Sequence, residues 1–462
     1  MTALDTRPVE AAVETPTAYK WRWPALGVIL AGSVMELLDA TVTNIAGPTM
    51  RTDLGGGTSL IQWLGAAYTL AMTAGLLTGG RLGDIVGRKR MFLIGVAGFT
   101  IGSLLCAIST GPEAIIAARV IQGLFGAAMI PQGMGLMKEM FPPKELQAAF
   151  GMFGPVMGIS AIGGPILAGW LVDADLFGTG WRMIFLVNLP LGIGAVLAAL
   201  RFLPATRPTG GVKLDIPGAL LASLGTVLIV FPLVQGGEHG WPWWAFAMMA
   251  ASVVTFAVFV AYERRKGEAA LVVPSLLRKP AFVSGLAVGA IYFAAFGGVF
   301  LVLGLYTQLG LGYSPLKAAL TSVPSSVGMI VGMGIASATV RFGRKVLLGG
   351  AVVMFFAVIA LALIAGPGVT PWQLAPALVF VGLGSGLIMG PYFNIVMAAV
   401  DPKETGSASG SLTAIQQVGG ALGLAILGTV FFGTGSAIIT FGVAAGMIAL
   451  TFVIGLMLPK AE

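Results

Sequence analysis

Two carboxylates stand close together in the first long apolar stretch of the chain. Glu36 and Asp39 lie between Pro24 and Pro48, and their spacing of three positions puts both on one face of a helix. Counted from Pro24, they lie about 18 and 22 Å along that helix, near the centre of a bilayer. An ionised acid at such a depth costs about 2.5–3.5 kcal/mol. This cost argues against incidental acids. It favours a pair that binds and releases a proton, with a purely structural ion pair as the alternative.

Arg119 is the one basic residue deep inside an apolar stretch. If its helix enters the membrane from the outer side, Arg119 lies about 9 Å below that surface and Asp39 about 13 Å. These depths allow an ion pair or a water-bridged network. Burial and a nearby cation shift the pKa of a carboxyl in opposite directions, so an acid between them can titrate near neutrality. We therefore expect Glu36, Asp39 and Arg119 to couple proton transfer, with Gln122 and Asn44 completing the polar cluster.

The second half of the chain offers few polar groups within its apolar stretches. We expect substrate contacts from Glu36, Asn44, Gln122, Tyr292, Asn394 and Gln416. Aromatic and methionine side chains could line an adaptable apolar cavity beside them. For any single one of these side chains, packing or a lipid-facing position is the simpler interpretation.

The segment from Gly80 to Arg90 is short, charged and rich in glycine. A basic anchor at the cytoplasmic side of a membrane explains its lysine and arginines. That interpretation leaves Asp84 unexplained. A carboxylate among glycines could bind a helix N-terminus or an arginine of the other half. We expect Gly83, Asp84, Gly87 and Arg88 to form a conformational latch that breaks and re-forms.

The stretch from Gly154 to Gly169 combines small residues at helical spacing with two prolines. Small residues let helices pack closely in lipid, and packing alone could account for the glycines. Pro155 and Pro165 remove backbone hydrogen bonds from a helix. Together with Gly164 they predict a helix that bends.

The elements that position these residues are transmembrane helices. The chain has 462 residues, of which 57% are hydrophobic and 10% charged, and its mean hydropathy is +0.94. Soluble domains are about 25% charged. Apolar runs of about 20 residues are long enough to span a bilayer. They predict fourteen helices, at 24–48, 60–80, 91–109, 113–137, 146–172, 182–203, 215–234, 243–262, 280–308, 316–340, 346–365, 372–398, 405–431 and 436–458.

The positions of the basic residues support this order of helices. Of the 26 Lys and Arg residues, 22 fall on the two terminal segments or on connections that follow even-numbered helices. The positive-inside rule puts these connections, and both termini, in the cytoplasm of a multi-pass cell-membrane protein. The net charge of +7 then faces anionic membrane lipids, so it needs no nucleic acid.

The expected fold class is an all-α polytopic membrane protein with two six-helix bundles and two inserted helices. Residues 1–22 read as a disordered cytoplasmic tail and 23–204 as the N-terminal bundle. Residues 205–268 form a linker with the two extra helices, and 269–462 the C-terminal bundle. Repeat-built transporters of this kind hold their ligand near the midplane between the halves.

The chain has one histidine, His239, and one cysteine, Cys106. These counts exclude a histidine-based metal centre and an intrachain disulfide. His239 stands among turn residues and is expected in a loop. No nucleophile–base set or phosphate-binding loop stands out, so we expect neither enzyme activity nor a cofactor.

Four segments resemble the major facilitator superfamily and, within it, the fourteen-helix drug:proton antiporters. They are Leu38–Pro48 (helix 1 motif), Gly80–Arg90 (signature between helices 2 and 3), Arg119–Pro131 (proton-translocation motif of helix 4) and Gly154–Gly169 (antiporter motif of helix 5). Thr43, Gly47, Ile85 and Ala168 depart from these motifs. The residue at 85 is usually basic, so the latch lacks one charged partner. The resemblance covers about residues 22–460.

The resemblance implies the major facilitator fold, alternating access between two halves, and proton-coupled efflux. We expect the exported substrates to be small, hydrophobic drugs or natural products, cationic ones included. It implies that Asp39 and Arg119 act in coupling and that Asp84 and Arg88 control the conformation. We expect a monomer, surrounded by membrane lipids, that uses a proton gradient for multidrug efflux and antibiotic resistance. The alternatives are a proton-coupled importer, a lipid translocase and a membrane-embedded sensor. The antiporter-type segment argues against the importer.

Overall fold

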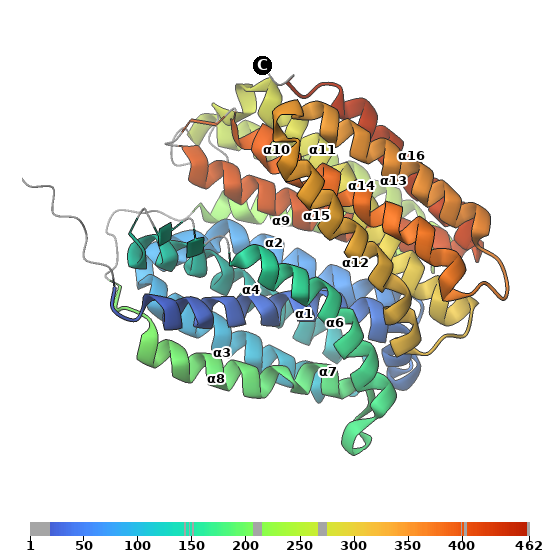
Figure 1. The fold of residues 1–462 in the computed structure, drawn as a ribbon, viewed down its shortest axis with the longest axis horizontal. Coiled ribbons are helices and arrows are strands. Elements are labelled where there is room, and N and C mark those ends of the chain that lie inside the picture. Colours follow the sequence, from blue (N-terminus) through green and yellow to red (C-terminus); the bar gives the residue numbers. More distant parts are fainter. Residues whose placement is uncertain are drawn as a thin grey trace, which may run out of the picture.

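The structure is a computed structural model that describes residues 19–142, 145–146, 148–149, 152–206, 215–266, 275–398, 400–401 and 404–459. Within these ranges the chain forms α-helices with short 3₁₀ and π turns, and no strands. The all-α class expected from the sequence is confirmed. Its physical reason is that a backbone in lipid must satisfy its polar groups within its own helix. Figure 1 shows the helices as two adjoining groups.

The first group comprises the helices before residue 203. They are α1 (Arg22–Leu54), α2 (Ser59–Val86), α3 (Arg88–Ala107), α4 (Pro112–Met140), α6 (Phe153–Ala174), α7 (Met183–Leu186) and α8 (Asn188–Phe202). The charged segment at residues 80–90 is mostly helical. Only Gly87 separates α2 from α3, and its φ of 98° is one that glycine adopts at little cost.

The second group is joined to the first through a helical hairpin. The hairpin consists of α9 (Ile216–Gln235) and α10 (Trp243–Lys266). The second group comprises α11 (Pro280–Leu305), α12 (Pro315–Ala338), α13 (Arg344–Ile364), α14 (Pro371–Ala398), α15 (Thr405–Thr434) and α16 (Ala437–Gly455). The segments 207–214 and 267–274, which flank the hairpin, lie outside the described residues, and the expected linker boundaries at 204/205 and 268/269 stay predictions.

Twelve helices of the described part are long and apolar enough to cross a membrane. A thirteenth is α2, if its parts Ser59–Leu76 and Thr78–Val86, which meet at a bend of 50°, form one span. In α6 the apolar helix Ile162–Ala174 is shorter than a span. The multi-pass architecture is therefore confirmed, whereas the count of fourteen spans stays a prediction.

The two ends of the molecule differ in the charges they carry. One end, here called the basic end, bears Arg22, Arg88, Arg201 and Lys266. The other, here called the opposite end, bears the connections 55–58, 175–182 and 236–242. Of the predicted tail, residues 1–18 lie outside the described part. Tyr19 donates a backbone hydrogen bond to Met140 at the end of α4.

The two helix groups meet at the opposite end. The carboxylate of Asp173 in α6 accepts a hydrogen bond from the backbone nitrogen of Leu316 in α12, at 3.1 Å. A Cβ added to Gly169 would lie 2.7 Å from the Leu316 Cα, and one on Gly304 in α11 would lie 2.9 Å from the carbonyl oxygen of Asn44 in α1. Only glycine allows these approaches. Figure 1 shows α6 and α12 together at this end.

The hairpin packs against both groups rather than standing apart. Its first helix, α9, contacts α2 of the first group and α15 of the second. The Thr429 hydroxyl of α15 donates to the carbonyl oxygen of Leu233 in α9. Nearer the basic end, the Gln417 amide of α15 donates to the sulfur of Met72 in α2. The hairpin therefore packs along the line where α2 and α15 meet, here called the seam.

Candidate functional site

Asp39 is buried at the middle of α1, with 1% of its surface exposed. Its Oδ2 accepts a hydrogen bond from Arg119 Nη1 of α4. Its Oδ1 accepts from the Gln122 amide nitrogen at 2.8 Å and from the Asn188 amide nitrogen at 3.4 Å. The carboxylate therefore receives one charged and two neutral donors. These donors hold the carboxylate in one position between α1, α4 and α8.

Arg119 is fully buried and is held by three kinds of contact. Besides Asp39, its Nη1 donates to Gln122 Oε1 at 2.8 Å, and its Nε donates to the Leu64 carbonyl oxygen at 2.9 Å. The guanidinium carbon lies 4.3 Å from the ring centroid of Tyr68, a distance typical of cation–π attraction. Its Nη2 is buried without a hydrogen-bond partner. Arg119 thus keeps one unused donor beside the carboxylate.

Ser103 and Asn188 belong to the same network, although sequence reasoning missed both. The Ser103 hydroxyl accepts from the Gln122 amide at 2.7 Å and from the Asn188 amide at 3.1 Å. Asn188 is 1% exposed and begins α8. A buried asparagine in an otherwise apolar stretch is a signal that could have been weighed. The serine carried no such signal, because small hydroxyl residues are common in membrane helices.

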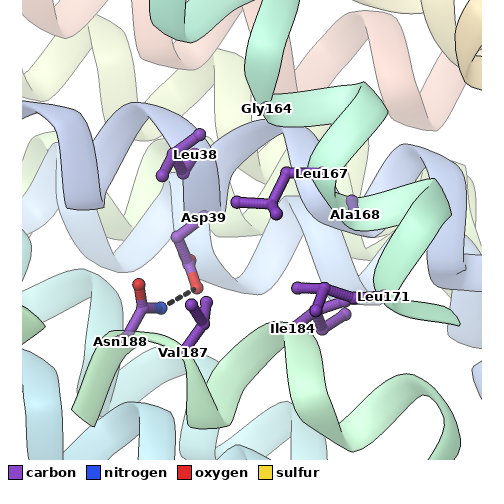
Figure 2. A pocket seen from close by; sticks show the side chains of 9 residues that line it. All are labelled: Leu38, Asp39, Gly164, Leu167, Ala168, Leu171, Ile184, Val187 and Asn188. Carbon is purple, nitrogen blue, oxygen red and sulfur yellow. Dashed lines mark hydrogen bonds between the residues drawn. The ribbon is translucent and has the colours of Figure 1, made fainter. Parts of the chain in front are cut away.

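A small pocket reaches the Asp39 carboxylate from the side of α6. It has a volume of about 10 Å³, and its lining includes Asp39, Asn188 and Gly164, which are labelled in Figure 2. This volume is close to the minimum for a single water molecule. The absence of a side chain at Gly164 matters here, since a Cβ there would lie 2.8 Å from the Thr41 hydroxyl. The pocket therefore has room for about one water molecule beside Asp39.

Glu36 lies one turn before Asp39 in α1 and is half-buried. The hydroxyl of the neighbouring Tyr68 in α2 is buried and has no hydrogen-bond partner among the described residues. No described basic side chain forms an ion pair with Glu36, in contrast to Asp39. The two acids therefore lie on one helix face, as expected, but only one of them is neutralised. The Tyr68 ring packs against the Arg119 guanidinium on the side of Asp39.

The residues expected to contact substrate do not form one cluster. Gln122 is in the Asp39 network, and both ends of its amide are used there. Tyr292 is buried in the second group, where its hydroxyl lies 2.6 Å from the Ser385 hydroxyl. Asn394 is exposed in α14, and Gln416 is half-buried in α15. Among the described side chains, none of these last three hydrogen-bonds to the Asp39 network.

The expected latch residues are joined within the first helix group. Arg88 donates to the Asp84 carboxylate at 2.8 Å and lies 3.1 Å from Glu139 of α4. Gly87 supplies the positive φ that lets α2 turn into α3. A Cβ on Gly83 would lie 1.7 Å from the Gln132 side chain of α4, so this glycine permits close packing. In this conformation the charges of Asp84 and Arg88 satisfy each other.

Two further predictions concern α6 and metal ions. Pro165 lies inside α6, and Pro155 also falls in this helix, but its side chain lies outside the described part. A bending role for Pro155, Gly164 and Pro165 stays a prediction. The described residues contain no group of three or more His, Cys, Asp or Glu side chains that could hold a metal ion. His239 lies in the α9–α10 connection, as expected of a loop residue.

Three curated relatives share most of the chain. It is 51% identical to a probable actinorhodin transporter of Streptomyces coelicolor, over 90% of this chain and 74% of that protein. It is 37% identical to a puromycin resistance protein of Streptomyces alboniger, over 98% of this chain and 92% of that protein. It is 33% identical to a tetracenomycin C resistance and export protein of Streptomyces glaucescens, over 88% of this chain and 75% of that protein.

A solved structure and a match to a whole protein family indicate the same class of protein as these relatives. A crystal structure of a POT family transporter in complex with 5-aminolevulinic acid has a TM-score of 0.68, covering 93% of this chain and 96% of that chain at 14% identity. At that identity the likeness concerns the fold alone. Residues 29–424 match the Major Facilitator Superfamily. This multi-pass membrane protein therefore belongs to the major facilitator superfamily of transporters.

Proposed function

We propose that the protein is a proton-coupled antiporter that exports small hydrophobic antibiotics or related natural products, cationic ones included. The names of its relatives include transporter, resistance and export, and they refer to actinorhodin, puromycin and tetracenomycin C. These names support the substrate class. The observation that carries the proton coupling is the fully buried pair of Asp39 and Arg119.

We propose that the basic end faces the cytoplasm, following the positive-inside rule. The opposite end, where α6 meets α12 and α1 meets α11, then faces outward. Its close contacts at Gly169 and Gly304 support an outward-closed state. Residues 23–204 and 269–462 act as the two halves that rock about the seam, with 205–268 as the inserted linker.

The coupling step follows from the cost of an unpaired buried charge. While Asp39 is ionised, it neutralises Arg119. A proton that arrives through the one-water pocket converts Asp39 to a neutral acid and leaves Arg119 without its carboxylate. Removing one partner of a buried pair costs about 3–5 kcal/mol, so protonation drives α1 and α4 to rearrange. Glu36, which has no cationic partner among the described residues, is placed to bind the cationic group of a substrate or a second proton.

The coupling is tested in proteoliposomes with puromycin as substrate. The wild-type protein should release protons when puromycin is added and should accumulate puromycin against a pH gradient. Asp39→Asn should lose the gradient-driven accumulation but keep exchange between equal concentrations. Asp53→Asn, an acid at the end of the same helix and outside the network, is the matched control. Full gradient-driven transport by Asp39→Asn would refute the coupling role of Asp39.

A loss of proton coupling in a variant must be distinguished from a loss of folding. Asp39→Glu keeps the charge, so it should fold even if the longer side chain impairs transport. Thermal unfolding and puromycin binding of each variant in detergent serve as checks. The substrate class is tested by growth of an antibiotic-sensitive strain that expresses the chain. Puromycin, actinorhodin and tetracenomycin C should each be tolerated at higher concentration, and unchanged tolerance to all three would exclude the proposed class.

A further inference from the structure

A second and larger pocket lies at the opposite end, away from Asp39. It has a volume of about 170 Å³ and is lined by the start of α2, the turn of the α9–α10 hairpin and the end of α15. The site described above uses none of these residues. The pocket therefore joins three parts of the fold: one helix of each group and the hairpin between them.

Glu238 places a carboxylate in this pocket. Its Oε1 accepts from the Ser59 backbone nitrogen at 2.7 Å and from the Thr58 hydroxyl at 3.0 Å, and its Oε2 accepts from the Ser59 hydroxyl at 2.9 Å. Burial raises the pKa of Glu238, but these hydrogen bonds outweigh it, so the pKa lies below its ordinary value. No Lys or Arg in the described ranges forms an ion pair with this carboxylate.

Gln62 adds an acceptor that lacks a donor. It is 2% exposed, lines the pocket one turn beyond Thr58 and Ser59, and its Oε1 is buried with no hydrogen-bond partner. A buried acceptor left unpaired is costly, and most such groups in proteins find a partner. A ligand held beside Glu238 can reach the Gln62 amide group.

Trp241 adds an aromatic ring to the lining of the pocket. Its indole lines the same space, and its φ of 55° is one that bulky residues rarely adopt. Aromatic faces attract cations. The hydroxyls of Thr58, Ser59 and Thr429 already donate to protein acceptors. What the pocket still offers a ligand is the Glu238 carboxylate, the side-chain amide of Gln62 and an aromatic ring, and the negative charge of the carboxylate suits a cation with N–H donors.

We propose that this pocket binds a small organic cation, a primary ammonium or a guanidinium group, at a site separate from the transport site. Because the pocket is built from α2 and α15 together, the bound cation contacts both helix groups. It therefore binds best when their ends are close, and it favours that conformation over one in which they separate. In the orientation proposed above, an external cation would slow the export cycle without being transported.

Binding is tested on the purified full-length protein with propylammonium and methylguanidinium as probes and 1-propanol as a neutral control. We expect saturable binding of both cations by calorimetry and none of propanol. Glu238→Gln should weaken binding at least tenfold. Gln62→Met, which leaves the bonds of Glu238 intact, should weaken it several-fold. Glu113→Gln, an exposed acid at the start of α4, is the matched control and should bind as the wild type does.

Two outcomes would overturn the proposal. Absence of binding, or equal binding of propanol, would mean that the pocket holds only water. Binding that survives Glu238→Gln but is lost in Glu36→Gln would place the cation at the transport site. Wild-type binding together with failed proton coupling by Asp39 would refute the proposed function alone, so the two failures can be told apart.

The conformational effect has its own readout. Spin labels at Phe177 and Trp372, which are 91% and 86% exposed on different helix groups at the opposite end, report the separation of the two groups. The background is Cys106→Ser, since Cys106 is the one native cysteine. Propylammonium should shift the distance distribution toward the shorter population, and it should not do so in Glu238→Gln. An unchanged distribution in the cation-bound protein would contradict the coupling between the pocket and closure.

Discussion

Arg119 donates to the Asp39 carboxylate across 80 positions of sequence, and both side chains are removed from solvent. The pair is embedded in amide and hydroxyl groups from α3, α4 and α8. A buried pair of this kind is weak as a source of stability, because desolvation offsets much of the attraction. We therefore propose that the pair serves the transport cycle and not the stability of the fold.

Asn188 should act as a positioning residue for Asp39. It donates to both Asp39 and Ser103, so Asn188→Ala removes one donor to the carboxylate. Loss of this donor should lower the rate of gradient-driven transport, with a loss of folding free energy of about 1–2 kcal/mol. A variant that is destabilised to this extent but transports at the wild-type rate would show that Asn188 serves the fold alone.

Gly169 should be required for closure of the opposite end. A Cβ at this position would lie 2.7 Å from the backbone of Leu316, which cannot move aside as a flexible side chain can. Gly169→Val should therefore populate the state in which α6 and α12 separate, seen as longer distances between labels at Phe177 and Trp372. Gly163→Val in the same helix is the control, because nothing lies within 4 Å of its Cβ position. Equal distance distributions for the two variants would rule out this role.

Asp84 distinguishes a latch from a simple membrane anchor. Its ion pair with Arg88 is partly exposed, with side-chain exposures of 26% and 29%, and such pairs contribute about 0.2–1 kcal/mol. Asp84→Asn should thus change the melting temperature little while it lowers the transport rate. Arg90→Ala removes a charge from the same segment without touching Asp84, and it should leave the rate near that of the wild type. If both variants transport equally well, the segment is only an anchor.

Asp53 gives the protein a stability that depends on pH. Hydrogen bonds from Trp181 at 2.9 Å and Arg182 at 2.7 Å hold the pKa of its carboxyl below the ordinary value. A group whose folded pKa is depressed stabilises the fold above its unfolded pKa, about 3.9, and loses this contribution as the pH falls through the folded pKa.

The measurement is the melting temperature in detergent between pH 7 and pH 3. Asp53→Asn should melt below the wild type at pH 7, and the gap should narrow on acidification because the wild-type carboxyl becomes protonated. Comparing the two proteins at each pH cancels the titration of the other acids. A gap that stays constant with pH would show that Asp53 contributes through shape and not through charge.

The sequence alone determined the class of the protein and the depth of its polar residues. Long apolar runs have one stable form in lipid, a helix, and the rise per residue then fixes how deep Asp39 and Arg119 lie. The free-energy cost of a charged side chain in a bilayer identified Asp39 and Arg119 as candidate functional residues without any knowledge of their contacts. The sequence also identified Gly169 as one of a row of small residues, but it did not show that Leu316 packs against this glycine.

Only the tertiary structure decided which side chains meet. The rotation of each helix about its axis depends on close packing with helices far away in sequence. Asn188 therefore turned out to bind Asp39 and Ser103, whereas Tyr292 binds Ser385. The same holds for Glu238, whose place in a polar connection gave no hint that it binds the start of α2. Spacing along one helix can be read from the chain, but neighbours across helices are set by the packed shape.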